Sequence, residues 1–202
     1  MSVGETPAED TFTLAVLAGG RGERLGGRVK PLAQLDGETL AERILRVLGP
    51  EAKETFLVAP ARLTGRLAEL ALVVEDPGEG PGQAVYAAAR LAQAPWLLVV
   101  AGDHVAPCPA LLRRLWAQRQ GVDAVVVRAE GRLQGTYALF RRDAVTALEA
   151  PGPRSLREIF SAVRVQEVSE DALSDEERAA LQDVDTPEDA ARFGISLPPP
   201  ER

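Results

Sequence analysis

Short, uninterrupted apolar runs recur along the chain, with amphipathic stretches between them. The runs are TLAVL (13–17), TFLVA (55–59), ALVVE (71–75), WLLVV (96–100), DAVVV (123–127) and RVQEV (164–168). Continuous rather than alternating hydrophobicity indicates strands that are buried on both faces. Helical patterns lie between them, at 39–48, 82–94 and 109–120. This alternation predicts an α/β fold with a Rossmann-like, doubly wound, mostly parallel sheet.

One segment departs from this pattern. Residues 130–142, EGRLQGTYALFRR, are shorter in their apolar stretch and more alternating, which is typical of an antiparallel or edge strand. A chain of 202 residues suits one domain better than two. We therefore expect a single domain over residues 12–195. Flexible tails are expected at 1–11 and 196–202, where little can be buried.

Composition excludes several classes of protein. The net charge of −7 argues against a nonspecific nucleic-acid surface, and no apolar run approaches the roughly 20 residues that a membrane span needs. The first residues, MSVGETPAEDTFT, carry no basic and apolar signal, so we expect a cytoplasmic protein without membrane partners.

Cys108 is the single cysteine and His104 the single histidine, which excludes an internal disulfide and a cysteine or histidine zinc cluster. His104 could touch phosphate, although a hydrogen-bonded structural role is at least as well supported, and we assign Cys108 no chemistry.

Glycines gather directly after the first apolar run, in LAVLAGGRGERLGGRVKPL (14–32). In an open α/β sheet ligands bind at the carboxyl ends of the strands, which is where this loop falls. Gly19, Gly20 and Gly22 let backbone N–H groups approach an anion, and Arg21 and Arg24 add positive charge. The loop could equally be a solvated turn. Its spacing matches neither the dinucleotide fingerprint nor the P-loop.

Lys30 closes this stretch. Of the 23 basic residues only Lys30 and Lys53 are lysines, and the others are arginines. A lysine at position 30 therefore indicates a place where a compact charge on a flexible side chain is needed. Farther on, the run WLLVVAGD delivers Asp103 to the same edge of the sheet, where a hard oxygen ligand could hold Mg²⁺ against phosphates. Asp103 could instead cap a turn or the helix near Pro109.

The sequence resembles the MobA-like nucleotidyltransferases, the family of molybdenum cofactor guanylyltransferase. LAGGRGERLGGRVKPL, VVEDPGEGPGQA, VVAGDH, GTYALFRR with RSLREIF, and DVDTPEDAARF match its motifs in family order and cover residues 14–193. The resemblance implies the nucleotidyltransferase type of α/β fold. It also implies that Lys30, Arg24 and Asp103 are catalytic and that Asp103 and Asp185 bind the metal. The nucleotide-binding residues that it implies are Leu17, Ala18, Gly19, Gly20, Arg21, Gly22, Lys30, Asp76, Gly80, Pro81 and Gly82.

Some of these positions have a plainer alternative. Asp76 could be a turn residue before Pro77. Asp185 could simply precede a helix that Thr186 caps, with Pro187 as its first residue, and it stands where the family often has asparagine and related cytidylyltransferases have aspartate. Ala59 stands where the guanylyltransferase has a nucleotide-contacting asparagine. Pro31 stands where the guanylyltransferase commonly has a glycine after the lysine. The sequence KPL is more similar to that of the sugar-phosphate enzymes.

The function implied by the resemblance is transfer of an NMP group from an NTP, with GTP favoured, to a phosphorylated acceptor, with molybdopterin favoured. Pyrophosphate leaves, and Mg²⁺ is the expected cofactor. A phosphate acceptor is already anionic, so the absence of histidine pairs and nucleophilic cysteines agrees with this chemistry. The alternatives are a cytidylyl or sugar-phosphate nucleotidyltransferase and a non-catalytic nucleotide-binding module of the same fold.

Overall fold

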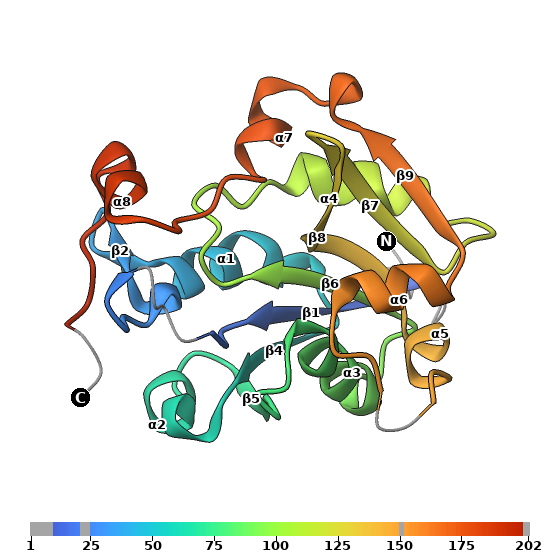
Figure 1. Cartoon of the computed structure of the whole chain (residues 1–202), viewed down its shortest axis with the longest axis horizontal. Helices are drawn as coiled ribbons and strands as arrows, with labels where there is room; N and C mark the ends of the chain where they lie inside the picture. Colours follow the sequence, from blue (N-terminus) through green and yellow to red (C-terminus); the bar gives the residue numbers. More distant parts are fainter. Residues whose placement is uncertain (1–9, 21–24, 150–151, 200–202) are drawn as a thin grey trace, which may run out of the picture.

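The apolar runs of the sequence form the strands of one sheet. The computed structural model describes residues 10–20, 25–149 and 152–199. In this part of the chain the main sheet has seven strands in the order β5-β4-β1-β6-β8-β7-β9 (Figure 1). The strands are β1 (Phe12–Leu17), β4 (Glu54–Ala59), β5 (Leu72–Glu75), β6 (Trp96–Ala101), β7 (Ala124–Ala129), β8 (Arg132–Arg141) and β9 (Val165–Ser169). A small separate sheet pairs β2 (Gln34–Leu35) with β3 (Glu38–Thr39).

The helices follow the strands as the pattern predicts. They are α1 (Leu40–Leu48), α2 (Thr64–Leu67), α3 (Pro81–Leu91), α4 (Pro109–Ala117), α5 (Arg142–Thr146), α6 (Leu156–Ala162), α7 (Asp175–Ala179) and α8 (Pro187–Phe193). Sequence signals fix where they begin. Thr39 and Glu42 form a capping box at the start of α1. Helices α3 and α4 begin with Pro81 and Pro109, because the first N–H of a helix has no acceptor within the helix and proline can therefore stand there.

The expectation of a mostly parallel sheet is confirmed. β1 pairs in parallel with β4 and β6, β4 with β5, and β7 with β9. The exception is β8, which is antiparallel to both of its neighbours, β6 and β7. The antiparallel reading of residues 130–142 is therefore confirmed and the edge reading is wrong. The cause is the tight turn at Glu130 and Gly131, with φ of 50° and 74°, which folds β8 back beside β7 and leaves its other side for β6.

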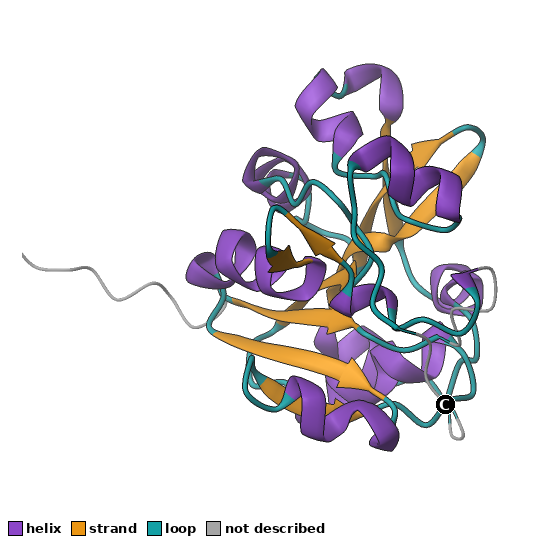
Figure 2. Ribbon diagram, turned by 90° about the vertical axis from the view of Figure 1, so that its left-hand side faces the viewer, coloured by secondary structure: helices purple, strands orange, loops and turns teal. Residues whose placement is uncertain are grey.

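Helices cover both faces of this sheet (Figure 2). Successive residues of β1 point to opposite faces: Leu14 and Val16 pack with residues of α1 and α4, whereas Ala15 between them packs with residues of α3 and α6. All three side chains have no exposed surface. Burial on both faces is the reason that these strands read as continuous apolar runs.

The C-terminal segment returns to the first third of the chain. Leu25 and Leu40 form a third apolar cluster with Val184 and Ile195, and α8 lies beside β2 (Figure 1). The backbones of Gln34 and Ser196 exchange hydrogen bonds of 2.8 Å, and the Nε of Arg28 donates to the carbonyl of Pro198 at 3.0 Å. The start of the expected C-terminal tail thus contacts the domain. Residues 200–202 and residues 1–9 of the expected N-terminal tail lie outside the described residues.

No helix in the described part of the chain is both long enough and apolar enough to cross a bilayer.

Candidate active site

A cavity of about 410 Å³ opens at the carboxyl ends of the parallel strands. This is the edge at which an open α/β sheet binds its ligands. Among the residues singled out in the sequence, those that line the cavity are Leu17, Gly19, Gly20, Lys30, Asp76, Gly80, Pro81 and Asp103. Segments far apart in the sequence therefore converge on one cavity, because each follows a neighbouring strand.

The glycine loop begins directly where β1 ends. The N–H of Ala18 donates to the carbonyl of Val58 at 2.8 Å, which continues the pairing of β1 with β4 by one residue. A Cβ on Gly19 would collide with the carboxylate of Asp76, and Gly20 has a φ of 104°. Glycine is thus required here by a close approach and by backbone conformation. Arg21, Gly22 and Arg24, expected in nucleotide binding or catalysis, lie outside the described residues.

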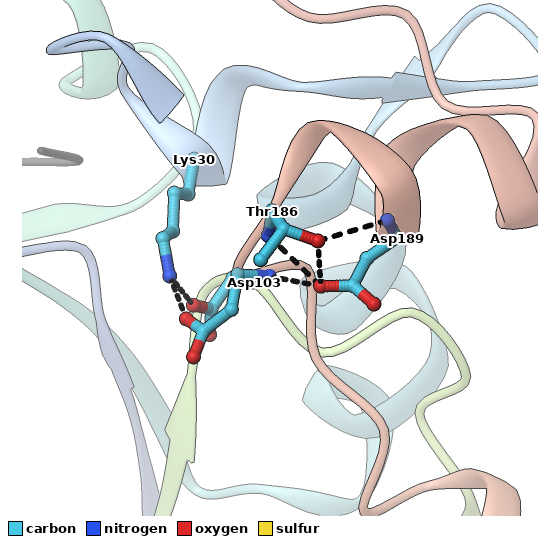
Figure 3. A network of polar contacts seen from close by, with 5 residues as sticks. Lys30, Asp103, Thr186 and Asp189 are labelled. Atoms are coloured by element: carbon cyan, nitrogen blue, oxygen red, sulfur yellow. Dashed lines mark hydrogen bonds and ion pairs between the residues drawn. The ribbon is translucent and has the colours of Figure 1, made fainter. Parts of the chain in front are cut away.

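Lys30 reaches the end of β6 from a short 3-10 helix, Lys30–Leu32. A Cβ on Gly102 would lie 2.7 Å from the Cγ of Pro31, so the glycine before Asp103 lets this turn pack against the strand end. The Nζ of Lys30 donates to Oδ2 of Asp103 at 2.9 Å and to Oδ1 of Asp185 at 2.5 Å (Figure 3). Burial lowers the pKa of Lys30, but the charges and hydrogen bonds of the two carboxylates outweigh it and raise the pKa above its ordinary value.

A third carboxylate belongs to this group. One oxygen each of Asp103, Asp183 and Asp185 lies within 4.8 Å of the others. The N–H of Val184 donates to the carbonyl of Asp103 at 3.2 Å, so an extended segment runs beside the end of β6. Desolvation, together with the negative charges of Asp103 and Asp185, raises the pKa of Asp183. Carboxylate oxygens at this spacing fit a hard divalent cation such as Mg²⁺.

Asp185 precedes a capped helix, as the plainer alternative expects, and its carboxylate also contacts Lys30, while its metal role stays a prediction. Thr186 caps α8 and forms a capping box with Asp189, whose carboxylate accepts from the N–H of Thr186 at 2.8 Å and from its hydroxyl at 2.7 Å (Figure 3). The same carboxylate accepts from the N–H of Asp185 at 3.2 Å. These hydrogen bonds lower the pKa of Asp189. The cap therefore fixes the backbone that carries Asp185 toward Lys30.

The segment from Asp76 to Gly82 closes the other side of the cavity. Oδ1 of Asp76 accepts from the N–H of Gly78 at 2.9 Å, and the N–H of Asp76 donates to the carbonyl of Ala59 at 2.9 Å. Asp76 is thus both a turn residue and a cavity residue. Gly80 and Pro81 line the cavity, whereas the N–H of Gly82 donates to the carbonyl of Arg154 at 3.0 Å. The chain around Arg154 covers Gly82 and separates it from the cavity.

The single histidine and the single cysteine are packed inside the protein. His104 is 2% exposed and lies edge-on to Tyr137, with ring centroids 5.8 Å apart, but neither ring nitrogen has a hydrogen-bond partner among the described residues, so the expectation of a hydrogen-bonded histidine is wrong. Cys108 is 2% exposed at the start of α4, and its Sγ accepts from the N–H of Leu111 at 3.5 Å. Burial raises the pKa of the Cys108 thiol, which keeps it protonated and unreactive at neutral pH.

Sequence reasoning missed three residues with polar side chains near the cavity: Asp183, Arg62 and Thr136. Asp183 had a usable signal, because residues two apart in an extended segment share a face and DVDTP places Asp183 two before Asp185. Thr136 lies within β8, whose place between β6 and β7 the sequence pattern did not predict. Arg62 had no signal, since one arginine among many after β4 carries no pattern.

The comparisons with known proteins agree on one family. Residues 14–168 match the model of the MobA-like NTP transferase domain. A probable molybdenum cofactor guanylyltransferase of Pelotomaculum thermopropionicum is 34% identical over 91% of this chain and 92% of the relative. A protein of Opitutus terrae with the same description is 37% identical over 88% and 92%. The crystal structure of molybdopterin-guanine dinucleotide biosynthesis protein A from Archaeoglobus fulgidus has a TM-score of 0.73 at 25% identity and covers 90% of this chain and 96% of its own.

Proposed function

Since the chain belongs to the MobA-like NTP transferase family and is in that sense a nucleotidyltransferase, we propose that it transfers GMP from GTP to molybdopterin and releases pyrophosphate. The observation that carries the proposal is the contact of Lys30 with Asp103 and Asp185 beside the glycine loop. A lysine, a group of carboxylate oxygens and a glycine-rich backbone lie in one cavity. Together these are the kinds of group that bind a triphosphate and its metal ion.

The proposed reaction is an in-line displacement at the α-phosphorus of the donor. A phosphate oxygen of the acceptor forms the new bond to the α-phosphorus. The bond from that phosphorus to the bridging oxygen of the β-phosphate breaks, and pyrophosphate leaves with the electron pair. The acceptor oxygen carries no proton at neutral pH, so the site needs alignment and charge stabilisation rather than a general base. This agrees with the packed positions of His104 and Cys108.

Lys30 would bind the phosphates and offset the charge that develops as pyrophosphate forms, with Arg24 assisting from the same loop. Its Nζ already lies at the metal end of the cavity, bonded to carboxylate oxygens that it can exchange for phosphate oxygens of similar charge. Leu17, Ala18, Gly19, Gly20, Arg21 and Gly22 would hold the nucleotide through the backbone, together with Asp76, Gly80 and Pro81, whereas Gly82 would only support the first turn of α3.

Mg²⁺ would neutralise and orient the triphosphate when bound. Asp103 and Asp185 would hold it, and the position of Asp183 within the same 4.8 Å group adds a third candidate ligand. The fit rests on donor chemistry, because all of these groups are carboxylates and Mg²⁺ prefers oxygen.

A second candidate is the same transfer with CTP as donor or a sugar phosphate as acceptor. The specific observation in its favour is Ala59. This residue is fully buried at the end of β4 and offers only a methyl group where the resemblance leads us to expect an amide.

The test is pyrophosphate release by the wild type and Asp103→Asn, supplied with purified molybdopterin and GTP, CTP, ATP or UTP in turn, with and without Mg²⁺. We expect turnover with GTP and Mg²⁺ only, and a loss of at least about a hundredfold in Asp103→Asn. Asp171→Asn, an exposed aspartate after β9, is the matched control and should keep full activity.

Other outcomes would redirect the proposal. Turnover with CTP, or with a sugar phosphate in place of molybdopterin, would replace it by the second candidate. Unchanged turnover in Asp103→Asn would remove the metal role of Asp103. Nucleotide binding without turnover on any acceptor would favour a non-catalytic module.

A further inference from the structure

The order of the strands sets an order of groups along the cavity. Neighbouring strands lie about 4.8 Å apart, and β5, β4, β1 and β6 are consecutive. Asp103 follows β6 and holds Lys30, so the cationic, metal-binding end of the cavity lies there. Asp76 follows β5 and Arg62 follows β4, at the other end. A nucleotide with its phosphates at Lys30 and the glycine loop therefore has its base beside Asp76 and Arg62.

Arg62 is held in place at this base end. It lies in the short 3-10 helix Ala61–Leu63, which is anchored by Leu63 with 1% exposure. The arginine side chain turns back to line the cavity, and its Nη2 donates to the carbonyl of Gly20 at 3.4 Å. The guanidinium thus lies against the glycine loop, between the end of β4 and the phosphate positions, and it presents a planar fork of N–H donors.

Guanine recognition at the base end of the cavity needs a hydrogen-bond donor, which neither Asp76 nor Ala59 supplies. The carboxylate of Asp76 only accepts hydrogen bonds, so it suits the N1–H and amino group of guanine. The O6 and N7 atoms of guanine are acceptors, and the buried methyl of Ala59 can give them nothing. A guanidinium pairs with O6 and N7 through two parallel hydrogen bonds, and adenine opposes this geometry because an amino group replaces O6.

Resting on the proposed function, we propose that Arg62 is the specificity-determining residue for the donor base and donates to O6 and N7 of guanine. Asp76 reads the adjacent N1–H and amino edge from β5. Arg62 then supplies the side-chain recognition that the missing amide at Ala59 would otherwise give. The position of Arg62 would explain how a chain that contains no asparagine selects guanine.

The test compares GTP with 7-deaza-GTP, in which a C–H replaces the N7 acceptor. Dissociation constants are measured by isothermal titration in Mg²⁺ for the wild type, Arg62→Ala and Arg113→Ala. We expect the wild type to bind GTP roughly tenfold more tightly than 7-deaza-GTP, as one charge-assisted hydrogen bond implies. Arg62→Ala should weaken GTP binding by roughly tenfold or more and bring the ratio of the two affinities close to one.

The control is an arginine of similar exposure at the opposite end of the strands. Arg113 pairs with Glu51, which precedes β4, at 3.3 Å. Arg113→Ala should keep both the wild-type affinities and their ratio. Because the comparison of the two nucleotides is also made on the unaltered protein, it does not depend on the folding of any variant.

Each contrary outcome has a separate meaning. Equal wild-type affinity for GTP and 7-deaza-GTP overturns the role of Arg62 and leaves GTP as the donor. An Arg62→Ala variant that binds both nucleotides more weakly by the same factor also overturns it, since Arg62 would then act on the phosphates or on the loop. A wild type that binds CTP and not GTP overturns the proposed donor itself, and this inference with it.

Discussion

At the scale of single residues, Lys30 would compete with the proposed metal ion for the same oxygens. The ammonium group occupies Oδ2 of Asp103 and Oδ1 of Asp185, and the side chain of Lys30 is 21% exposed. These carboxylates, with Asp183, form a group of like charges that needs a cation. In the absence of metal, Lys30 is that cation. Binding of the proposed metal would therefore require Lys30 to leave these oxygens, which would free it for the proposed contact with phosphate.

Replacing Lys30 by methionine tests this competition. Lys30→Met keeps much of the side-chain volume and removes the charge, so Mn²⁺ should bind to the nucleotide-free protein roughly two- to tenfold more tightly, as partly exposed ion pairs imply. The measurement is Mn²⁺ titration followed by electron paramagnetic resonance. Lys53→Met, the change at the other lysine of the chain, should leave Mn²⁺ affinity unchanged. Equal or weaker binding by Lys30→Met would show that Lys30 organises the carboxylates instead of competing for them.

At the scale of elements, the first turn of α3 is fitted to the segment before α6. A Cβ on Gly82 would lie 2.7 Å from the carbonyl oxygen of Pro153 and 2.8 Å from the carbonyl carbon of Arg154. These are backbone atoms, which cannot rotate away. We expect Gly82→Ala to lower the free energy of unfolding by about 1–3 kcal/mol through overpacking, measured by urea denaturation.

A second glycine gives the matched control. Gly65 lies in α2 with no atom within 4 Å of an added Cβ, so Gly65→Ala should leave stability unchanged or raise it by up to about 1 kcal/mol. If Gly82→Ala were as stable as Gly65→Ala, the contact between α3 and the chain around Arg154 would be loose rather than fitted.

The elements also show how far the sequence could be interpreted. The buried strands and their parallel pairing followed from continuous apolar runs, because burial on both faces leaves that pattern. The place of β8 did not follow, since it depends on a turn at Glu130 that sends the strand back between β7 and β6. Lys30 and Asp103 were found from the glycine loop and the strand that precedes the aspartate. Asp183 was missed although DVDTP carried a signal, because its place beside Asp103 depends on the return of a distant segment to the sheet edge, and Arg62 was missed because one arginine among many after β4 carries no pattern.

At the scale of the whole molecule, the last third of the chain runs from one edge of the sheet, β9, to the end of the central strand β6. β9 forms one edge of the sheet, α7 lies beside α4 (Figure 1), and the segment before α8 brings Asp185 to Lys30. The join between α7 and α4 is the pair of Glu177 and Arg114: Glu177 is 3% exposed and accepts from Nε and Nη2 of Arg114 at 2.7 and 3.0 Å. Ser174 and Glu177 also form the capping box of α7.

Glu177→Gln tests how much this join contributes. The hydrogen bonds from Arg114 outweigh desolvation and lower the pKa of Glu177 below its ordinary value of 4.5, so its contribution to stability is present above pH 4.5 and is lost as the pH falls through the folded-state pKa.

At pH 7 we expect Glu177→Gln to lower the midpoint of thermal unfolding by about 3–6 °C. The difference from the wild type should shrink below pH 4.5 and disappear once the pH has fallen through the folded-state pKa, where the wild-type carboxylate is protonated as well. Glu69→Gln, at an exposed position after α2, should match the wild type at every pH. A midpoint difference that stayed constant from pH 7 to pH 3 would mean that the shape of the side chain, and not its charge, holds α7 against α4.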